Sequence, residues 1–161
     1  MTVVTHPRRK SRLASMIDSA GGLAVGVALN RARGNIEALR PRGMEELARH
    51  IEVLSALEPP TDAEAAIRTL LLVNRTANHI IDAAAPFGLD ELCAVAVSLC
   101  DMVDHAPADG GAFDWRIIAV HIQSLRLLHA LPADADAERA RITAHLSHMV
   151  AKKFGQPGQT G

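Results

Sequence analysis

The sequence predicts an all-α protein, arranged as an up-down four-helix bundle with one or two additional N-terminal helices. Apolar residues recur at every third or fourth position along the 161-residue chain, and no alternating run typical of a strand occurs. The composition is dominated by Ala, Leu, Arg and Glu, which are good helix formers. Short connections containing Pro or Gly separate the periodic segments, so neighbouring helices are expected to run antiparallel.

Composition and charge exclude several classes of function. With 48% hydrophobic residues and a net charge of −1, the chain is expected to be globular. Near-neutral charge and only 2% aromatic residues argue against nucleic acid as a partner. No apolar run reaches the roughly 20 residues of a membrane helix, so no membrane partner is expected. Cys93 and Cys100 lie too far apart on one helix for a disulfide, which predicts a reducing, cytoplasmic location.

The N-terminal part is expected to hold a basic tail with a short turn at 1–22 and helical segments at 23–58. A helix is predicted from Leu23 to Arg40, and Pro41 must kink or interrupt it. Whether 23–58 is one kinked helix or two is left open by the sequence. Gly26 and Gly34 suggest a close helix–helix approach, which motivates a homodimer formed through these N-terminal helices.

The bundle itself is predicted at 61–154. A capping box formed by Thr61 and Glu64 begins a helix that ends before Pro86 and Gly88. The following helix is apolar almost all round and should therefore be central. Asp114 is expected to cap the next one. These later helices are predicted at 89–104, 114–131 and 134–154, followed by a tail at 155–161.

The helix before Pro86 carries the best candidate for chemistry. On a helical wheel, Arg75, His79 and Asp82 fall opposite the apolar stripe, with Leu72 and Thr76 at the edge of the exposed face. A neutral imidazole is a nucleophile near neutral pH, and Arg75 one turn earlier can hold phosphoryl oxygens. The alternative is an ordinary solvated helix face. The core stripe is expected to contain Ile67, Leu70, Val73, Ala77, Ile80, Ile81 and Ala84.

The stretch from Ala77-Asn78-His79 through Ala85-Pro86-Phe87-Gly88-Leu89 resembles the centre of histidine-containing phosphotransfer (HPt) domains. The resemblance implies a four-helix bundle that relays phosphate between histidine kinases and response regulators in bacterial two-component or chemotaxis signalling. It also implies a response-regulator receiver domain or a histidine kinase as partner.

Two alignments with the HPt pattern remain open. Matching Phe87-Gly88 to the apolar-Gly pair of the family places Asn78 at the acceptor position, whereas the wheel selects His79 and puts Asp82 where the family has Lys. We therefore expect one of two alternative forms of the module. In one, His79 relays phosphate; in the other, which the missing Lys and Gly slightly favour, the surface only binds the partner. That surface comprises Leu72, Arg75, Asn78, His79 and Asp82.

The remaining histidines predict no metal or cofactor site. His121 lies on an apolar face and is expected to be a core histidine bonded to a neighbour. His145 and His148 are three residues apart, but no acidic residue at the next turn completes a metal site. The sequence shows no phosphate-binding Gly loop, so the protein is at most a phosphorelay intermediate and is not expected to be a stand-alone enzyme.

Overall fold

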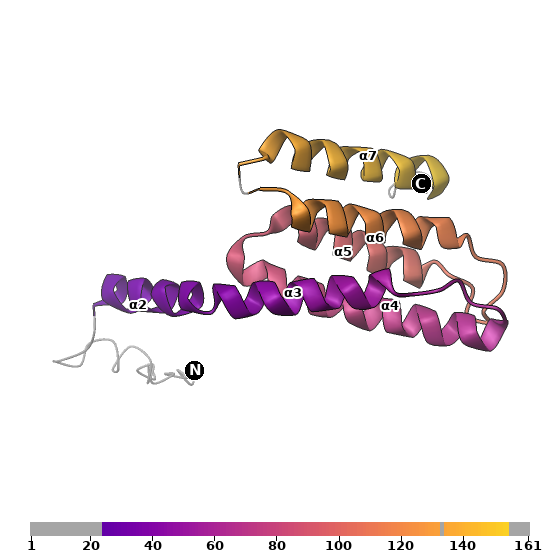
Figure 1. Ribbon diagram of the computed structural model, residues 1–161, viewed down its shortest axis with the longest axis horizontal. Helices are drawn as coiled ribbons and strands as arrows, with labels where there is room; N and C mark the ends of the chain where they lie inside the picture. Colours follow the sequence, from indigo (N-terminus) through magenta and orange to yellow (C-terminus); the bar gives the residue numbers. More distant parts are fainter. Residues whose placement is uncertain (1–23, 133, 155–161) are drawn as a thin grey trace, which may run out of the picture. The chain divides into compact units, whose positions relative to one another are not determined.

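The computed structural model describes residues 24–132 and 134–154, and the chain divides into two compact units, Met1–Ala38 and Leu39–Gly161. Every regular element in these described residues is helical, which confirms the all-α class (Figure 1). None of the described helices is both long enough and apolar enough to cross a membrane. The elements are α2 (Val25–Ala38), α3 (Arg40–Ser55), α4 (Ala63–Ala84), η1 (Ala85–Phe87), α5 (Asp90–Asp104), α6 (Trp115–Ala130) and α7 (Asp136–Phe154).

The predicted N-terminal segment forms two helices rather than one kinked helix. α2 ends at Ala38, and α3 begins at Arg40 with Pro41 in its first turn, where a missing N–H has no intrahelical partner to lose. α2 contains no buried residue. The expected close approach at Gly26 and Gly34 concerns a second chain and stays a prediction. The predicted basic tail at 1–22 lies outside the described residues.

Within Leu39–Gly161, consecutive helices pack against one another. α3 packs on α4, α4 on α5, and α5 on α6, while α6 returns to contact α3. α7 packs on α5 and α6 (Figure 1). Leu47, Ile51 and Leu54 of α3 are buried in the core shared with α4, α5 and α6. α3, which the sequence grouped with the N-terminal segment, thus forms one wall of the unit that carries α4.

The predicted central position of α5 agrees with its neighbours. It contacts α4 on one side and α6 and α7 on the other, and its apolar residues lie in the shared core. Burial raises the pKa of both thiols on this helix, Cys93 and Cys100, which are free and half-buried. The fully buried α5 positions are Leu92, Val95, Ala96, Leu99 and Met102.

The start of α4 corrects the predicted capping box. The N-cap is Asp62, whose carboxylate accepts a hydrogen bond from the Ala65 N–H at 2.8 Å. Thr61 instead donates its hydroxyl to Asp62 at 3.2 Å. Asp62 has the extended backbone that an N-cap requires, and its charged oxygen is a stronger acceptor than a hydroxyl. The helix therefore starts one residue later than a Thr61 cap would place it.

The turn after α4 sets the angle at which α5 leaves it. η1 continues the chain as a 3₁₀ turn through Pro86, and Gly88 then adopts a left-handed conformation with φ of 66°. Phe87 lies against Gly43 of α3 so closely that a side chain at position 43 would overlap its ring. Gly43 thereby allows α3 to approach the end of α4.

Asp114 joins the start of α6 to the C-terminal end of α7. Asp114 accepts a hydrogen bond from the Arg116 N–H at 3.1 Å, which confirms it as the N-cap of α6. Its carboxylate also accepts from the Arg116 side chain and from Lys153 of α7. These two cations hold the pKa of Asp114 well below its usual range.

Candidate functional site

The outer face of α4 presents most of the side chains that the sequence singled out. Arg75, Asn78, His79 and Asp82 are exposed, and Leu72 is half-buried at the edge. The opposite face is the core stripe. It differs from the predicted stripe because Ile67 is 37% exposed and Ile81 is half-buried. Thr76, placed at the exposed edge, is buried, and so is Ala66. The buried α4 positions are Ala66, Leu70, Val73, Thr76, Ala77, Ile80 and Ala84.

His79 lies beside a second histidine, His50 of α3. The centroids of the two rings are 4.9 Å apart, and the ring planes are inclined by 45°. His50 is half-buried, with a side-chain exposure of 12%, whereas His79 is exposed. The packing of α3 against α4 thus produces a pair of imidazoles with one accessible member.

The surroundings of His50 define its protonation state. Arg49 has only donors, and its Nη2 lies 3.0 Å from Nε2 of His50, so this nitrogen accepts and the ring is neutral. Burial, the Arg49 cation and His79 lower the pKa of His50, while the Glu46 carboxylate, 3.8 Å away, opposes them. Glu46 also pairs with Arg49 at 2.6 Å. His50 is therefore uncharged at neutral pH and bears its proton on Nδ1.

Asn78 lies at the edge of the exposed α4 face that is next to α5, opposite the edge next to α3 where His79 lies. Its amide donates to the Asn74 backbone carbonyl and to the Asn74 side chain, both at 2.9 Å, and lies 3.7 Å from the Cys100 sulfur of α5. The side chain is thus engaged with α4 and turned toward α5. His79, by contrast, is turned toward α3.

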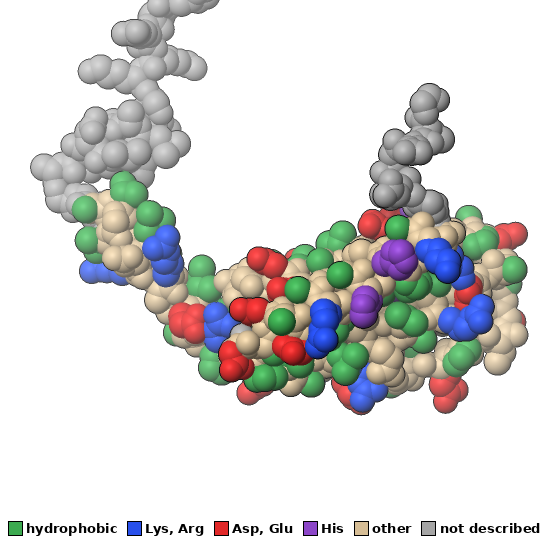
Figure 2. Space-filling model, turned by 90° about the horizontal axis from the view of Figure 1, so that it is seen from above, with side chains coloured by type: hydrophobic (Ala, Val, Ile, Leu, Met, Phe, Trp, Pro, Cys, Tyr) green, Lys and Arg blue, Asp and Glu red, His purple; other side chains and the backbone are tan. Residues whose placement is uncertain are grey.

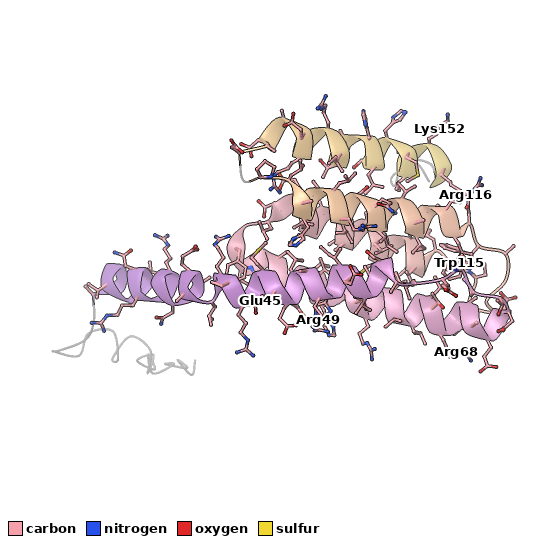
Figure 3. All side chains as sticks on the ribbon, viewed as in Figure 1. Glu45, Arg49, Arg68, Trp115, Arg116 and Lys152 are labelled. Atoms are coloured by element: carbon pink, nitrogen blue, oxygen red, sulfur yellow. The ribbon has the colours of Figure 1, made fainter. Side chains whose placement is uncertain are left out.

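Positive charge lines α4 on the N-terminal side of His79. Arg75 precedes His79 by one turn and helps to line a shallow hollow of about 500 Å³. Figure 3 shows Arg49 projecting from α3 and Arg68 from α4, both away from α6 and α7. Arg68 pairs with Glu64 one turn earlier. The hollow is lined by Arg68, Leu71, Leu72, Asn74 and Arg75.

His121 is a core histidine, as the sequence predicted. Its side chain is fully buried, with Nδ1 at 2.7 Å from the Ile117 carbonyl and Nε2 at 3.0 Å from the Ser98 hydroxyl. A carbonyl can only accept, so Nδ1 carries the proton and Nε2 accepts from Ser98. Burial lowers the pKa of His121. The Nδ1 bond stays within α6 and fixes the ring, whereas the Nε2 bond to Ser98 joins α6 to α5.

His145 and His148 are exposed on α7. Figure 2 shows the face seen from above in Figure 1, where histidine side chains lie among basic and hydrophobic ones. Within the described residues, no group of three or more His, Cys, Asp or Glu side chains is placed to hold a metal ion.

His50 and its neighbours are the part of the site that sequence reasoning missed. His50 lies three residues after Leu47 and directly before Ile51, at the border of the apolar α3 stripe. This position marks a side chain that can reach an adjacent helix, but the sequence does not say which helix. Comparison with protein-family models, curated proteins and solved structures finds no match for this chain.

Proposed function

We propose that this protein is a cytoplasmic signalling module of the phosphotransfer type, built as an HPt-like up-down bundle. In this proposal the outer face of α4 docks onto a response-regulator receiver domain or a histidine kinase. His79 accepts the phosphoryl group, and Leu72, Arg75, Asn78 and Asp82 contact the partner. The observation that carries the proposal is an exposed imidazole on a helical surface, with an arginine one turn before it and a second imidazole beside it.

In this proposal the bundle consists of α3 to α6 rather than of residues 61–154, because these four helices pack pairwise. The packing gives α4 one face against the core and one toward solvent. Of the two alignments, the surroundings favour His79 over Asn78. An amide is no nucleophile, and the Asn78 amide is already engaged with Asn74. His79 has no hydrogen bond to another described side chain, so its ring can turn toward a partner.

The transfer needs little machinery on this protein. A ring nitrogen of His79 attacks phosphorus, and the new N–P bond forms as the bond to the donor aspartate oxygen or histidine nitrogen breaks. The donor atom leaves with the bonding electron pair. Positioning and charge stabilisation provide most of the catalysis in phosphoryl transfer, and Arg75 supplies a cation for the transferred oxygens.

The proposal is tested by incubating the full-length protein with radiolabelled, phosphorylated receiver domains and histidine kinases from the same genome. Wild type is compared with His79→Gln and with His145→Gln, a matched exposed histidine on α7. We expect an acid-labile, base-stable label on wild type and on His145→Gln, and no label on His79→Gln.

Binding is measured by titrating each partner against these three proteins and against Arg75→Glu. A wild type that binds a receiver or kinase without acquiring label, and loses that binding in Arg75→Glu, identifies the non-transferring form. Neither label nor binding with any of these partners removes the proposed function.

A second candidate function, oligomerisation through α2, is favoured by one specific observation. α2 contains no buried residue, and its apolar side chains are exposed: Val25 by 67%, Leu29 by 52% and Ile36 by 42%. They repeat at spacings of four and seven, and Ala32 fills the step between, as in the contact stripe of a two-stranded coiled coil.

Light scattering of the full-length protein distinguishes this second function. If α2 pairs two chains, wild type has twice the mass of one chain, and Leu29→Glu with Ile36→Glu returns it to one. A wild type with the mass of a single chain at micromolar concentration removes the idea.

A further inference from the structure

The resemblance implies a lysine that compensates the charge of the phosphoryl group. In the alignment that takes His79 as the acceptor, this chain has Asp82 at the corresponding position of α4. A carboxylate there repels a phosphoryl group instead of binding it. Any compensation must therefore come from elsewhere. α4 itself offers Arg75, and the helix packed beside it, α3, brings His50 and Arg49 to the same place.

We propose that His50 is the second binding group for the phosphoryl group on His79, in place of the missing lysine. The inference rests on the proposed function in its phosphate-accepting form. It commits to one role: Nδ1 of the His50 ring donates a hydrogen bond to a phosphoryl oxygen, and Nε2 gains a proton from solvent as that negative charge arrives and gives up the hydrogen bond from Arg49.

The geometry suits this role. A phosphoryl oxygen lies two bonds beyond the ring nitrogen of His79, and the His50 ring centroid is only 4.9 Å from the His79 centroid. His50 is held by packing, with 12% side-chain exposure, so little conformational freedom is lost when it binds. In the unphosphorylated protein Arg49 donates to Nε2, which leaves the Nδ1 N–H as the ring's donor.

The electrostatics give His50 a further property that a lysine lacks. The charged groups facing it are Arg49 and Glu46 on α3 and the His79 ring on α4, and together with burial they leave it neutral before transfer. A phosphoryl group carries up to two negative charges, which favour the protonated imidazole. His50 thus adds positive charge only after His79 has been phosphorylated.

The test uses the full-length protein and potassium phosphoramidate as a small phosphoryl donor, so that no protein partner is needed. A ring nitrogen of His79 attacks phosphorus, the P–N bond of the donor breaks, and ammonia leaves with the bonding electrons. Phosphohistidine is followed by ³¹P NMR in wild type, His50→Gln, His50→Lys and the control His145→Gln. Circular dichroism checks that each variant folds.

Loss of one charge-assisted hydrogen bond predicts that phosphohistidine in His50→Gln forms or survives about tenfold less well than in wild type. His50→Lys restores the wild-type behaviour, and His145→Gln equals wild type. In wild type itself, the pH midpoint of the His50 ring-proton resonances moves upward on phosphorylation, a change that a purely structural role does not produce.

Two results overturn the inference and are distinguishable. If His79 is labelled equally in wild type and His50→Gln, and the His50 midpoint does not move, the role of His50 fails while the proposed function stands. If neither phosphoramidate nor any phosphorylated partner labels His79 in wild type, the role of His50 fails together with the phosphate-accepting form of the proposed function.

Discussion

A buried and an exposed histidine site show what packing does to one side-chain type. His121 is fully buried between α5 and α6, with one ring nitrogen donating to a backbone carbonyl and the other accepting from Ser98. His79 is exposed on α4, and its ring lies beside that of the half-buried His50. An imidazole with both nitrogens engaged can only hold structure together, whereas an exposed one is free for chemistry.

The largest expected difference between the two sites is in stability. His121→Ala leaves a core cavity and an unpartnered Ser98 hydroxyl, which should lower the free energy of unfolding by about 2–4 kcal/mol. His79→Ala removes an exposed ring and should change it by no more than about 0.5 kcal/mol. Urea denaturation of both variants measures the contrast. An equal loss in both would mean that His79 is part of the core packing and not an accessible acceptor.

The second largest expected difference between the sites is in how their stability contributions depend on pH. Folding lowers the pKa of His121 and of His50, so below the usual value of about 6.5 the unfolded chain binds more protons than the folded one. The contribution of each neutral ring to the free energy of unfolding is therefore fully present above that pH. It falls as the pH is lowered, by at most about 1.4 kcal/mol per pH unit for each ring.

This slope is measured from urea midpoints between pH 7.5 and 5, because carboxylates titrate at lower pH. His121→Gln should remove the larger part, because burial is deeper there, and His50→Gln a smaller part. A slope that is unchanged in His121→Gln would contradict the neutral, doubly bonded ring described for the core.

A smaller effect is expected when only the hydroxyl partner of the buried ring is removed. Ser98→Ala takes the donor from Nε2 of His121 and should cost about 1 kcal/mol of unfolding free energy. The matched control is Ser147→Ala, an exposed serine on α7. In a double-mutant cycle with His121→Gln, the two losses should not add. Additive losses would show that the hydroxyl and the ring do not interact.

How much of this contrast could be predicted depends on how far apart in the sequence the interacting residues lie. Helical spacing predicted that His121 is buried and that His79 is exposed, because both properties follow from the periodicity of one helix. Local rules were less reliable at helix ends: Asp62 caps α4 where Thr61 was expected, because both residues suit a cap. Thr76, at the edge of the stripe, is buried although its place on the wheel did not predict this.

His50 could not be found in the same way. Its role depends on α3 packing against α4 rather than against another helix, and on the register that places position 50 opposite position 79. Gly43 helps to set this approach, since a side chain there would overlap Phe87. These are contacts between residues about 30 to 45 positions apart, and periodicity within one helix carries no information about them.

The smallest effect expected concerns the balance of charge around His50. Glu46 is exposed and pairs with Arg49, so Glu46→Gln should leave the melting temperature essentially unchanged, as for most surface ion pairs. It should nevertheless lower the pKa of His50 further, because the carboxylate that opposes Arg49 is gone. Glu45→Gln, one position away on α3, is the control for a change in net charge.

The pH midpoint of the His50 ring protons, read by NMR, measures this shift directly. A midpoint that falls in Glu46→Gln but not in Glu45→Gln shows that a local pair sets the charge of this ring. The same variant should then also weaken the gain of a proton by His50 when His79 is phosphorylated, since the starting neutral state is more favoured. Equal midpoints in wild type and both variants would mean that burial alone keeps His50 neutral, and that Arg49 and Glu46 have no part in the site.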